Sequence, residues 1–259
     1  MILDEYTLAM RRRFLAEGTI RARGYEVRRW VAACPGWVTA DREDIERYLD
    51  GRALGARARY TAISHLHRFY VWAIREGHAE IDPTAGIERP RLPHRLPRPA
   101  RLGDVELVIA GAPPRLATTM LLMVDAGLRC CEAARLEWDD VDLAAGVVVV
   151  RGKGDRDRML GLTPRLAANL ATYNDDTGPV FGRTVTPGRL SQIVNHELHA
   201  GGLNITAHRL RHTFATRAYR LLHGDLLALA QLLGHASVLN TQIYARVDVD
   251  AAAAAVRRL

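Results

Sequence analysis

The apolar positions of this chain recur mostly every three or four residues, which is the period of helices that bury one face. The clearest example runs over residues 56–76, where Gly77 follows as a helix stop. The buried stripe expected for this helix consists of Ile63, Leu66, Phe69, Tyr70 and Ala73. In the N-terminal part the same pattern predicts four helices, over residues 4–17, 19–34, 41–50 and 56–76.

The remainder of the chain also has a helical pattern, with one short interruption. Apolar spacing and capping signals predict helices near residues 102–111, 115–126, 163–172 and 186–200, one that starts at Thr206, and one over 226–233. The interruption reads V-V-V-V-R, then R-G-K-G-D-R-D, then R-M-L-G-L, which is typical of a β-hairpin. The sequence therefore predicts a mainly α fold with a small antiparallel β-sheet.

A stretch rich in proline and arginine separates the two parts. It runs D-P-T-A-G-I-E-R-P-R-L-P-H-R-L-P-R-P from Asp82 to Pro99. Because proline at this density prevents regular structure, we expect a stiff, extended connector. The predicted division is a helical domain over residues 1–82, a linker over 83–100 and a second domain over 101–259. The linker is either a spacer or a basic strand that follows a duplex backbone.

Composition narrows the class of protein. The chain has 259 residues, 48% of them hydrophobic and 25% charged, which is ordinary for a globular protein. No apolar run approaches a membrane span, and we find no signal-peptide pattern at the N-terminus. The cysteines are Cys34, Cys130 and Cys131, an odd number without C-x-x-C spacing. This argues against a disulfide framework or a zinc site, and it favours a reducing cytoplasm.

The charge points to a polyanionic partner. The net charge is +7 and the sequence pI is about 9.8, which favours nucleic acid over a membrane surface. The alternative is a generally basic soluble protein. Arg57, Arg59, His65 and Arg68 lie largely off the apolar stripe of their helix, so they are candidate DNA contacts or simply a solvated face. Of the 36 lysine and arginine residues only Lys153 is a lysine. Either one lysine has survived by chance on a turn, or this position needs a compact ammonium able to give up its proton.

The residues that suggest chemistry gather between Thr206 and Tyr244. The stretch begins T-A-H-R-L-R-H-T-F-A-T and ends L-L-G-H-A-S-V-L-N-T-Q-I-Y. His208 and Arg211 are three apart and share one helix face, and His235 directly follows the helix stop Gly234. A phenol can attack phosphorus while cations hold the charged oxygens, so this set suits a phosphodiester.

A metal site is not expected in this stretch. His208 and His212 are four apart, but the glutamate of an H-E-x-x-H motif is missing and no third ligand presents itself. We interpret the remaining histidines near the candidate site as structural; they are His196, His199, His212 and His223. A P-loop is excluded because glycine, not serine or threonine, follows Lys153.

These motifs together resemble the tyrosine site-specific recombinases of the phage integrase family. H-x-x-R-H-T-F-A-T, L-L-G-H and the tyrosine occur in the family's order. Upstream, G-L-R-C-C-E supplies Arg129 and Glu132, and the hairpin supplies Lys153. The resemblance covers the chain from about Leu102 onward and, loosely, the N-terminal part. It implies a SAM-like core-binding domain followed by a catalytic domain with a C-terminal tail helix.

The resemblance also implies a reaction. Tyr244 would attack a DNA phosphorus and form a 3′-phosphotyrosyl bond, releasing a 5′-hydroxyl. Arg129 and Arg211 would bind the non-bridging oxygens, with Arg129 oriented by Glu132. The implied roles of the remaining residues are proton donation to the leaving oxygen by Lys153, help in deprotonating the nucleophile by His208, and phosphate binding or support by His235. No metal or other cofactor is implied.

Partners and alternatives follow from the same resemblance. We expect double-stranded DNA recombination sites, a homotetramer with exchange of C-terminal tails, and room for a directionality factor, in the bacterial cytoplasm at the nucleoid. The alternative for the tail, residues 251–259, is a frayed helix on its own domain. The chain starts almost directly with the core-binding helices, so no separate arm-binding domain is expected. Phage-type integration and Xer-like resolution both remain open, beside a type IB topoisomerase and a non-catalytic DNA-binding regulator.

The single lysine gives a first prediction. Lys153→Arg keeps the positive charge but removes a readily transferred proton, so we expect strand cleavage to be badly impaired. The measurement is the single-turnover rate of covalent attachment to a DNA substrate. Near-normal cleavage by this variant would show that proton donation is not the role of Lys153.

Overall fold

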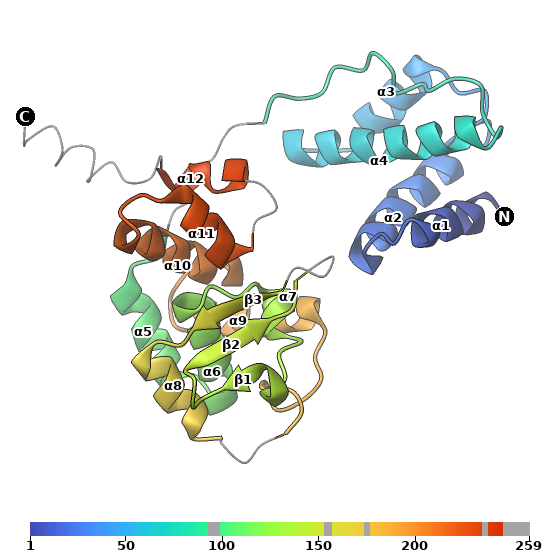
Figure 1. Cartoon of the computed structure of the whole chain (residues 1–259). Coiled ribbons are helices and arrows are strands. Elements are labelled where there is room, and N and C mark those ends of the chain that lie inside the picture. Colours follow the sequence, from blue (N-terminus) through green and yellow to red (C-terminus); the bar gives the residue numbers. More distant parts are fainter. Residues whose placement is uncertain (93–98, 153–156, 174–176, 235–237, 246–259) are drawn as a thin grey trace, which may run out of the picture. The chain divides into compact units, whose positions relative to one another are not determined.

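The chain forms two compact units, Met1–His94 and Arg95–Leu259 (Figure 1). The computed structural model describes residues 1–92, 99–152, 157–173, 177–234 and 238–245. The predicted connector, residues 83–100, spans the point at which the two units divide.

The N-terminal unit contains four helices that enclose an aromatic core. They are α1 (Ile2–Arg12), α2 (Glu17–Ala33), α3 (Arg42–Asp50) and α4 (Ala56–Arg75), and α2 packs against both α1 and α4. Asp41 caps α3 by accepting a hydrogen bond from the backbone N–H of Asp44 at 3.0 Å. In the core, the Trp30 indole donates to the Tyr70 hydroxyl at 2.9 Å, and that hydroxyl donates to the Trp37 carbonyl at 2.8 Å.

The C-terminal unit is built around a buried helix. Its helices are α5 (Leu102–Gly111), α6 (Pro114–Asp125), α7 (Cys130–Ala133), α8 (Pro164–Ala171), α9 (Pro187–Ala200), α10 (Ala207–Leu221), α11 (Leu226–Leu233) and α12 (Gln242–Ala245), with 3-10 turns η1 (Trp138–Asp140) and η2 (Val238–Asn240). Every residue of α6 from Leu116 to Asp125 is buried, because α5, α8 and α10 all pack against this helix. Helix α6 is therefore the scaffold of the unit.

A small antiparallel sheet completes this unit. Its strands are β1 (Val141–Asp142), β2 (Val147–Val150) and β3 (Arg158–Gly161), in the order β1-β2-β3. Val148 pairs with Leu160 and Val150 pairs with Arg158. Since Val148, Val150 and Leu160 are buried, the two-residue period places Arg158 on the inner face as well. The predicted mainly helical fold with a small antiparallel sheet is confirmed.

Element boundaries differ from the predictions in a few places. The first helix ends at Arg12 because Phe14 adopts a left-handed backbone with φ +52°. Strand β1 is too short to leave a periodic pattern, and it was not predicted. Thr206 takes the N-cap position of α10, but its side chain makes no capping hydrogen bond. Gly234 ends α11 in the left-handed region at φ +58°, as its sequence position indicated.

Candidate active site

The turn after α6 brings Arg129 toward α10. Gly127 has φ +68°, and a Cβ atom there would lie 2.2 Å from the ring of Phe214. Only glycine allows this approach of the turn to α10. The same approach lets Arg211, from α10, donate to the carbonyl of Gly127. Arg129 takes the N-cap position of α7. The guanidinium groups of Arg129 and Arg211 therefore lie in one region, between the turn after α6 and helix α10.

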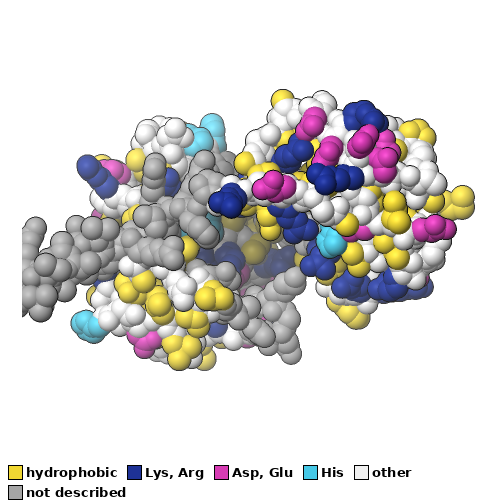
Figure 2. All heavy atoms as spheres, turned by 90° about the horizontal axis from the view of Figure 1, so that it is seen from above, with side chains coloured by type: hydrophobic (Ala, Val, Ile, Leu, Met, Phe, Trp, Pro, Cys, Tyr) yellow, Lys and Arg dark blue, Asp and Glu magenta, His cyan; other side chains and the backbone are white. Residues whose placement is uncertain are grey.

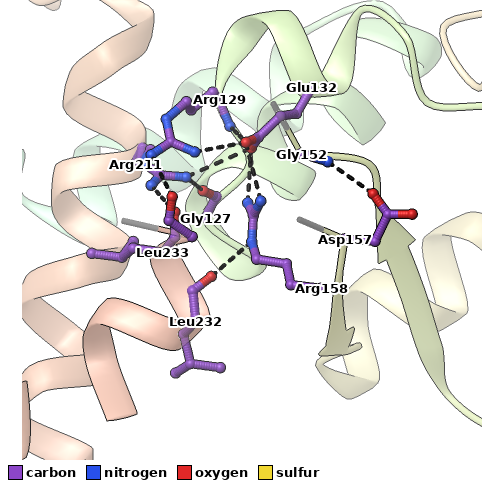
Figure 3. Close-up of polar contacts among 10 residues, drawn as sticks. Gly127, Arg129, Glu132, Gly152, Asp157, Arg158, Arg211, Leu232 and Leu233 are labelled. Atoms are coloured by element: carbon purple, nitrogen blue, oxygen red, sulfur yellow. Dashed lines mark hydrogen bonds and ion pairs between the residues drawn. The ribbon is translucent and has the colours of Figure 1, made fainter. Parts of the chain in front are cut away.

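Glu132 lies at the centre of this region, among the guanidinium groups (Figure 3). Its Oε1 accepts from Nη1 of Arg129 at 2.7 Å and from Nη1 of Arg158 at 3.1 Å. Its Oε2 accepts from Nη2 of Arg158 at 2.8 Å and from the backbone N–H of Arg129 at 2.7 Å. Nη1 of Arg211 is 3.7 Å from the same oxygen. One carboxylate thus holds three guanidinium groups, and the cluster carries two net positive charges (three positive, one negative).

The electrostatics of Glu132 reflect these partners. Burial alone raises the pKa of Glu132, whose side chain is only 7% exposed. Hydrogen bonds from Arg158 and Arg129, with their positive charges, outweigh burial and lower the pKa of Glu132 to about 2. The carboxylate is therefore charged at any physiological pH. Burial lowers the pKa of Arg211 to about 10, and the nearby charge of Arg129 acts in the same direction.

The same arginines also bind the carboxyl end of α11. Nε of Arg158 donates to the carbonyl of Leu232 at 2.9 Å, and Nη2 of Arg211 donates to that of Leu233. Nη2 of Arg129 donates to the carbonyl of Gly234 at 3.3 Å. Three consecutive carbonyls at the negative end of a helix therefore each accept a hydrogen bond from a different guanidinium.

Tyr244, the candidate nucleophile, lies in α12 with 2% of its surface exposed. Its hydroxyl is 2.8 Å from Nδ1 of His212, whose ring contacts that of His208 edge-to-face at 4.4 Å between centroids. Burial raises the pKa of Tyr244 to about 12, although the charges of Arg211 and Arg129 oppose this rise. The phenol is therefore neutral at pH 7.

The surroundings of His208 favour its neutral form. The pKa of His208 is lowered by partial burial and by the nearby charges of Arg211 and Arg129, although the residue is exposed to solvent. A neutral imidazole can accept a proton, which is the property that a general base needs.

Four of the six predicted catalytic residues are described, and all four belong to the C-terminal unit; they are Arg129, His208, Arg211 and Tyr244. Lys153 and His235 lie outside the described residues. Beside Lys153, the N–H of Gly152 donates to Oδ1 of Asp157 at 3.1 Å.

Two contributors were missed in the sequence. His212, which we interpreted as structural, contacts the Tyr244 hydroxyl; its i, i+4 relation to His208 was the available signal. Arg158 was given no role. Its signal was a charged residue at an inward position of a strand, two residues from the apolar Leu160.

The predicted DNA contacts on α4 fall into different environments. Arg57 and Arg68 are exposed, and their spacing places them only about 20° apart around the helix. Arg59 lies about 200° from Arg57 and pairs with Asp50 at 2.6 Å. His65 is half-buried, and burial, with Arg23 nearby, lowers its pKa. In the face shown in Figure 2, basic groups on the N-terminal unit alternate with acidic and apolar ones.

Within the described residues, no three histidine, cysteine, aspartate or glutamate side chains are grouped as metal ligands would be. No helix in this part of the chain is both long and apolar enough to span a bilayer.

Comparison with known proteins identifies the family. The model of the phage integrase family matches residues 107–250, which is more than half of the chain. The chain belongs to the phage integrase family. Tyrosine recombinase XerC of Azotobacter vinelandii (strain DJ / ATCC BAA-1303) is 34% identical over 80% of this chain and 74% of the relative. XerC of Xylella fastidiosa (strain M23) is 29% identical over 82% and 78%.

Solved structures agree on the fold. A lambda integrase dimer bound to a COC′ core site superposes with a TM-score of 0.76 at 20% identity, covering 94% of this chain and 75% of that one. The integrase from mycobacterium phage Brujita has a TM-score of 0.50 at 27% identity, covering 94% and 90%. The protein is thus a tyrosine recombinase, a DNA strand-transferring enzyme, and the topoisomerase and regulator alternatives are not favoured.

The lowered pKa of Glu132 predicts a pH dependence of stability. The ionised carboxylate stabilises the fold above its ordinary pKa of 4.5, and this contribution is lost as the pH falls toward about 2. A shift of this size corresponds to about 3 kcal/mol. We expect the free energy of unfolding in urea to fall more steeply with acid in the parent protein than in Glu132→Gln. The exposed control Asp139→Asn should keep the parent slope, and equal slopes for all three proteins would contradict the prediction.

Proposed function

We propose that this recombinase cuts and rejoins DNA at specific sites through Tyr244. The phenolic oxygen forms a bond to a backbone phosphorus, and the bond from phosphorus to the 5′-oxygen breaks. The departing oxygen takes a proton, which leaves a 5′-hydroxyl and a 3′-phosphotyrosyl ester. Attack by a 5′-hydroxyl of a partner strand reverses the step and reseals the DNA, so no external energy source is needed.

The observation that carries this proposal is the environment of the Tyr244 hydroxyl. It lies at hydrogen-bonding distance from His212, and the positive charges of Arg211 and Arg129 favour its ionised form. Because burial raises the pKa of Tyr244 to about 12, loss of its proton needs a nearby base. The paired imidazoles of His208 and His212 are suited to that task.

The remaining roles are assigned to the cation cluster. Arg129 and Arg211 bind the non-bridging oxygens, since planar guanidinium forks match phosphate geometry. Lys153 protonates the leaving oxygen, and His235 binds a phosphate oxygen or supports the site. A pentavalent phosphorus carries two negative charges, which the two net positive charges of the cluster complement.

The proposed DNA contacts outside the active site begin with α4. Arg57 and Arg68 share one exposed face of this helix and suit a duplex backbone. His65 lies on the same side but is half-buried. Arg59 would have to leave Asp50 to reach DNA.

We assign the C-terminal tail to an apolar cavity of a neighbouring copy in a homotetramer. The C-terminal unit has a cavity of about 270 Å³, and its lining includes Phe214, Leu221 and Leu232. The tail sequence A-A-A-A-A-V-R-R-L offers small and aliphatic side chains of matching character. A lambda integrase, which shares the fold, is known as a tetramer bound to a Holliday junction.

Two biological settings fit this activity. The curated relatives named above are XerC recombinases, which favours Xer-like exchange between sites of the host. The similarity to a phage integrase favours integration of a viral genome, with a directionality factor as an additional partner. Both settings place the protein in the bacterial cytoplasm at the nucleoid. The two settings can be distinguished by comparing recombination between two sites on one plasmid with recombination between sites on two DNA molecules.

A suicide substrate tests the nucleophile. A duplex selected for binding is nicked beside the cleavage position, so that a short fragment diffuses away and the covalent adduct accumulates. We expect an adduct with the parent protein and with Tyr219→Phe, a control in the same unit, but none with Tyr244→Phe, which lacks the attacking oxygen. Absence of an adduct with the parent protein, or an adduct with Tyr244→Phe, would overturn the proposed function.

A further inference from the structure

Arg158 is a buried charged residue with no assigned role. Its side chain is 9% exposed and lies on the inner face of β3, in register with the buried Val150. An arginine in this position makes little contact with solvent and is poorly placed to meet DNA. A buried guanidinium needs a structural or functional partner, because its desolvation is costly.

All three guanidinium nitrogens of Arg158 are engaged by protein atoms (Figure 3). Nη1 and Nη2 bind the two oxygens of Glu132 as a bidentate pair, at 3.1 and 2.8 Å. Nε donates to the carbonyl of Leu232 at 2.9 Å. A bidentate pair fixes the plane of the carboxylate as well as its position. Arg158 therefore determines how Glu132 faces the other arginines.

Removing Arg158 would change the hydrogen bonds that the Glu132 carboxylate makes with its remaining partners. Arg129 already donates to Glu132, and Nη1 of Arg211 is 3.7 Å away. Without the bidentate partner, the carboxylate would turn toward these two groups and draw their guanidinium groups away from the positions in which they would meet a phosphate. The net charge of the cluster would also fall from two positive charges to one.

Arg158 also fixes the turn that leads from α11 toward α12. A Cβ atom on Gly234 would lie 3.0 Å from Nη1 of Arg158, so the guanidinium packs directly against this backbone. With its bond to Leu232, Arg158 ties β3 to the end of α11. The chain that continues from Gly234 reaches Tyr244 ten residues later.

We propose that Arg158 is a positioning residue for strand cleavage. It holds Glu132 by a bidentate pair, so that the carboxylate keeps the guanidinium groups of Arg129 and Arg211 in place, and it anchors the carboxyl end of α11. This inference rests on the proposed function, since it assigns the two arginines to the phosphate. Arg158 itself does not touch the DNA.

The test compares Arg158→Gln, Arg158→Lys and the control Arg165→Gln. Arg165 pairs with the buried Asp125 in the same unit, so its loss also leaves a buried carboxylate short of a partner. Single-turnover cleavage of the suicide substrate is measured at saturating DNA, at a temperature where thermal unfolding shows each protein folded. We expect both Arg158 variants to cleave about 10- to 100-fold more slowly, while DNA affinity changes little and Arg165→Gln cleaves normally.

A second substrate separates positioning from general structural damage. A methylphosphonate at the cleaved position removes the negative charge that Arg129 and Arg211 neutralise. If Arg158 acts through these two arginines, its loss should slow cleavage of this neutral substrate much less than cleavage of the phosphodiester. Lysine keeps the charge without the fork, so Arg158→Lys still tests the inference if Arg158→Gln does not fold.

Each outcome has a defined meaning. Cleavage of the phosphodiester within about threefold of the parent rate, or equal slowing of both substrates, would overturn the inference. An adduct with the parent protein shows that the proposed function stands in either case. If the parent protein forms no adduct, the proposed function itself fails, and the failure is not specific to Arg158.

Discussion

The candidate active site depends on one buried carboxylate that holds three arginines from separate parts of the chain. Glu132 binds Arg129 from the turn after α6, Arg158 from β3 and, at longer range, Arg211 from α10. Three guanidinium groups at this separation would repel one another without an anion among them. Removing a buried partner of this kind is strongly destabilising, because the charges that remain are uncompensated. The catalytic unit is thus organised around an interaction that also leaves it with excess positive charge.

In the proposed function, this excess charge prepares the site for the phosphate. Under the same proposal, protein contacts hold the guanidinium groups near the reaction centre before DNA arrives. The carbonyls at the end of α11 receive the same three arginines. Under the proposed function, a phosphate that binds Arg129 and Arg211 must therefore compete with backbone oxygens of the segment that leads to Tyr244. This shared set of donors would couple binding of the phosphate to placement of the proposed nucleophile.

The pKa shifts of Glu132 and Tyr244 have opposite directions and give the two groups different charge states. The pKa of Glu132 falls to about 2, which keeps it as a permanent anion, whereas the pKa of Tyr244 rises to about 12 and keeps it neutral. A neutral, buried phenol is a weak nucleophile, and the imidazoles beside it can accept its proton. In the proposed function, the same burial makes activation of Tyr244 depend on His212 and His208.

Much of this arrangement could be predicted from local sequence. Helical periods, Gly234 as a stop and the spacing of Arg129 from Glu132 depend on neighbouring residues, so the pattern reveals them. Arg158 and Glu132 are 26 residues apart, and their pairing depends on how the sheet packs against α7. The contact between His212 and Tyr244 spans 32 residues and depends on the path after α11. The pairing of Arg59 with Asp50 likewise appears only when α3 and α4 are placed in space.

The most direct test is a crystal structure of Tyr244→Phe bound to a duplex that carries its recombination site. We predict that Arg129 and Arg211 both lie within about 3 Å of oxygens of one phosphate, with Glu132 still bound by Arg129 and Arg158. Arginines on different phosphates, or a Glu132 carboxylate that has left the cluster, would contradict the account.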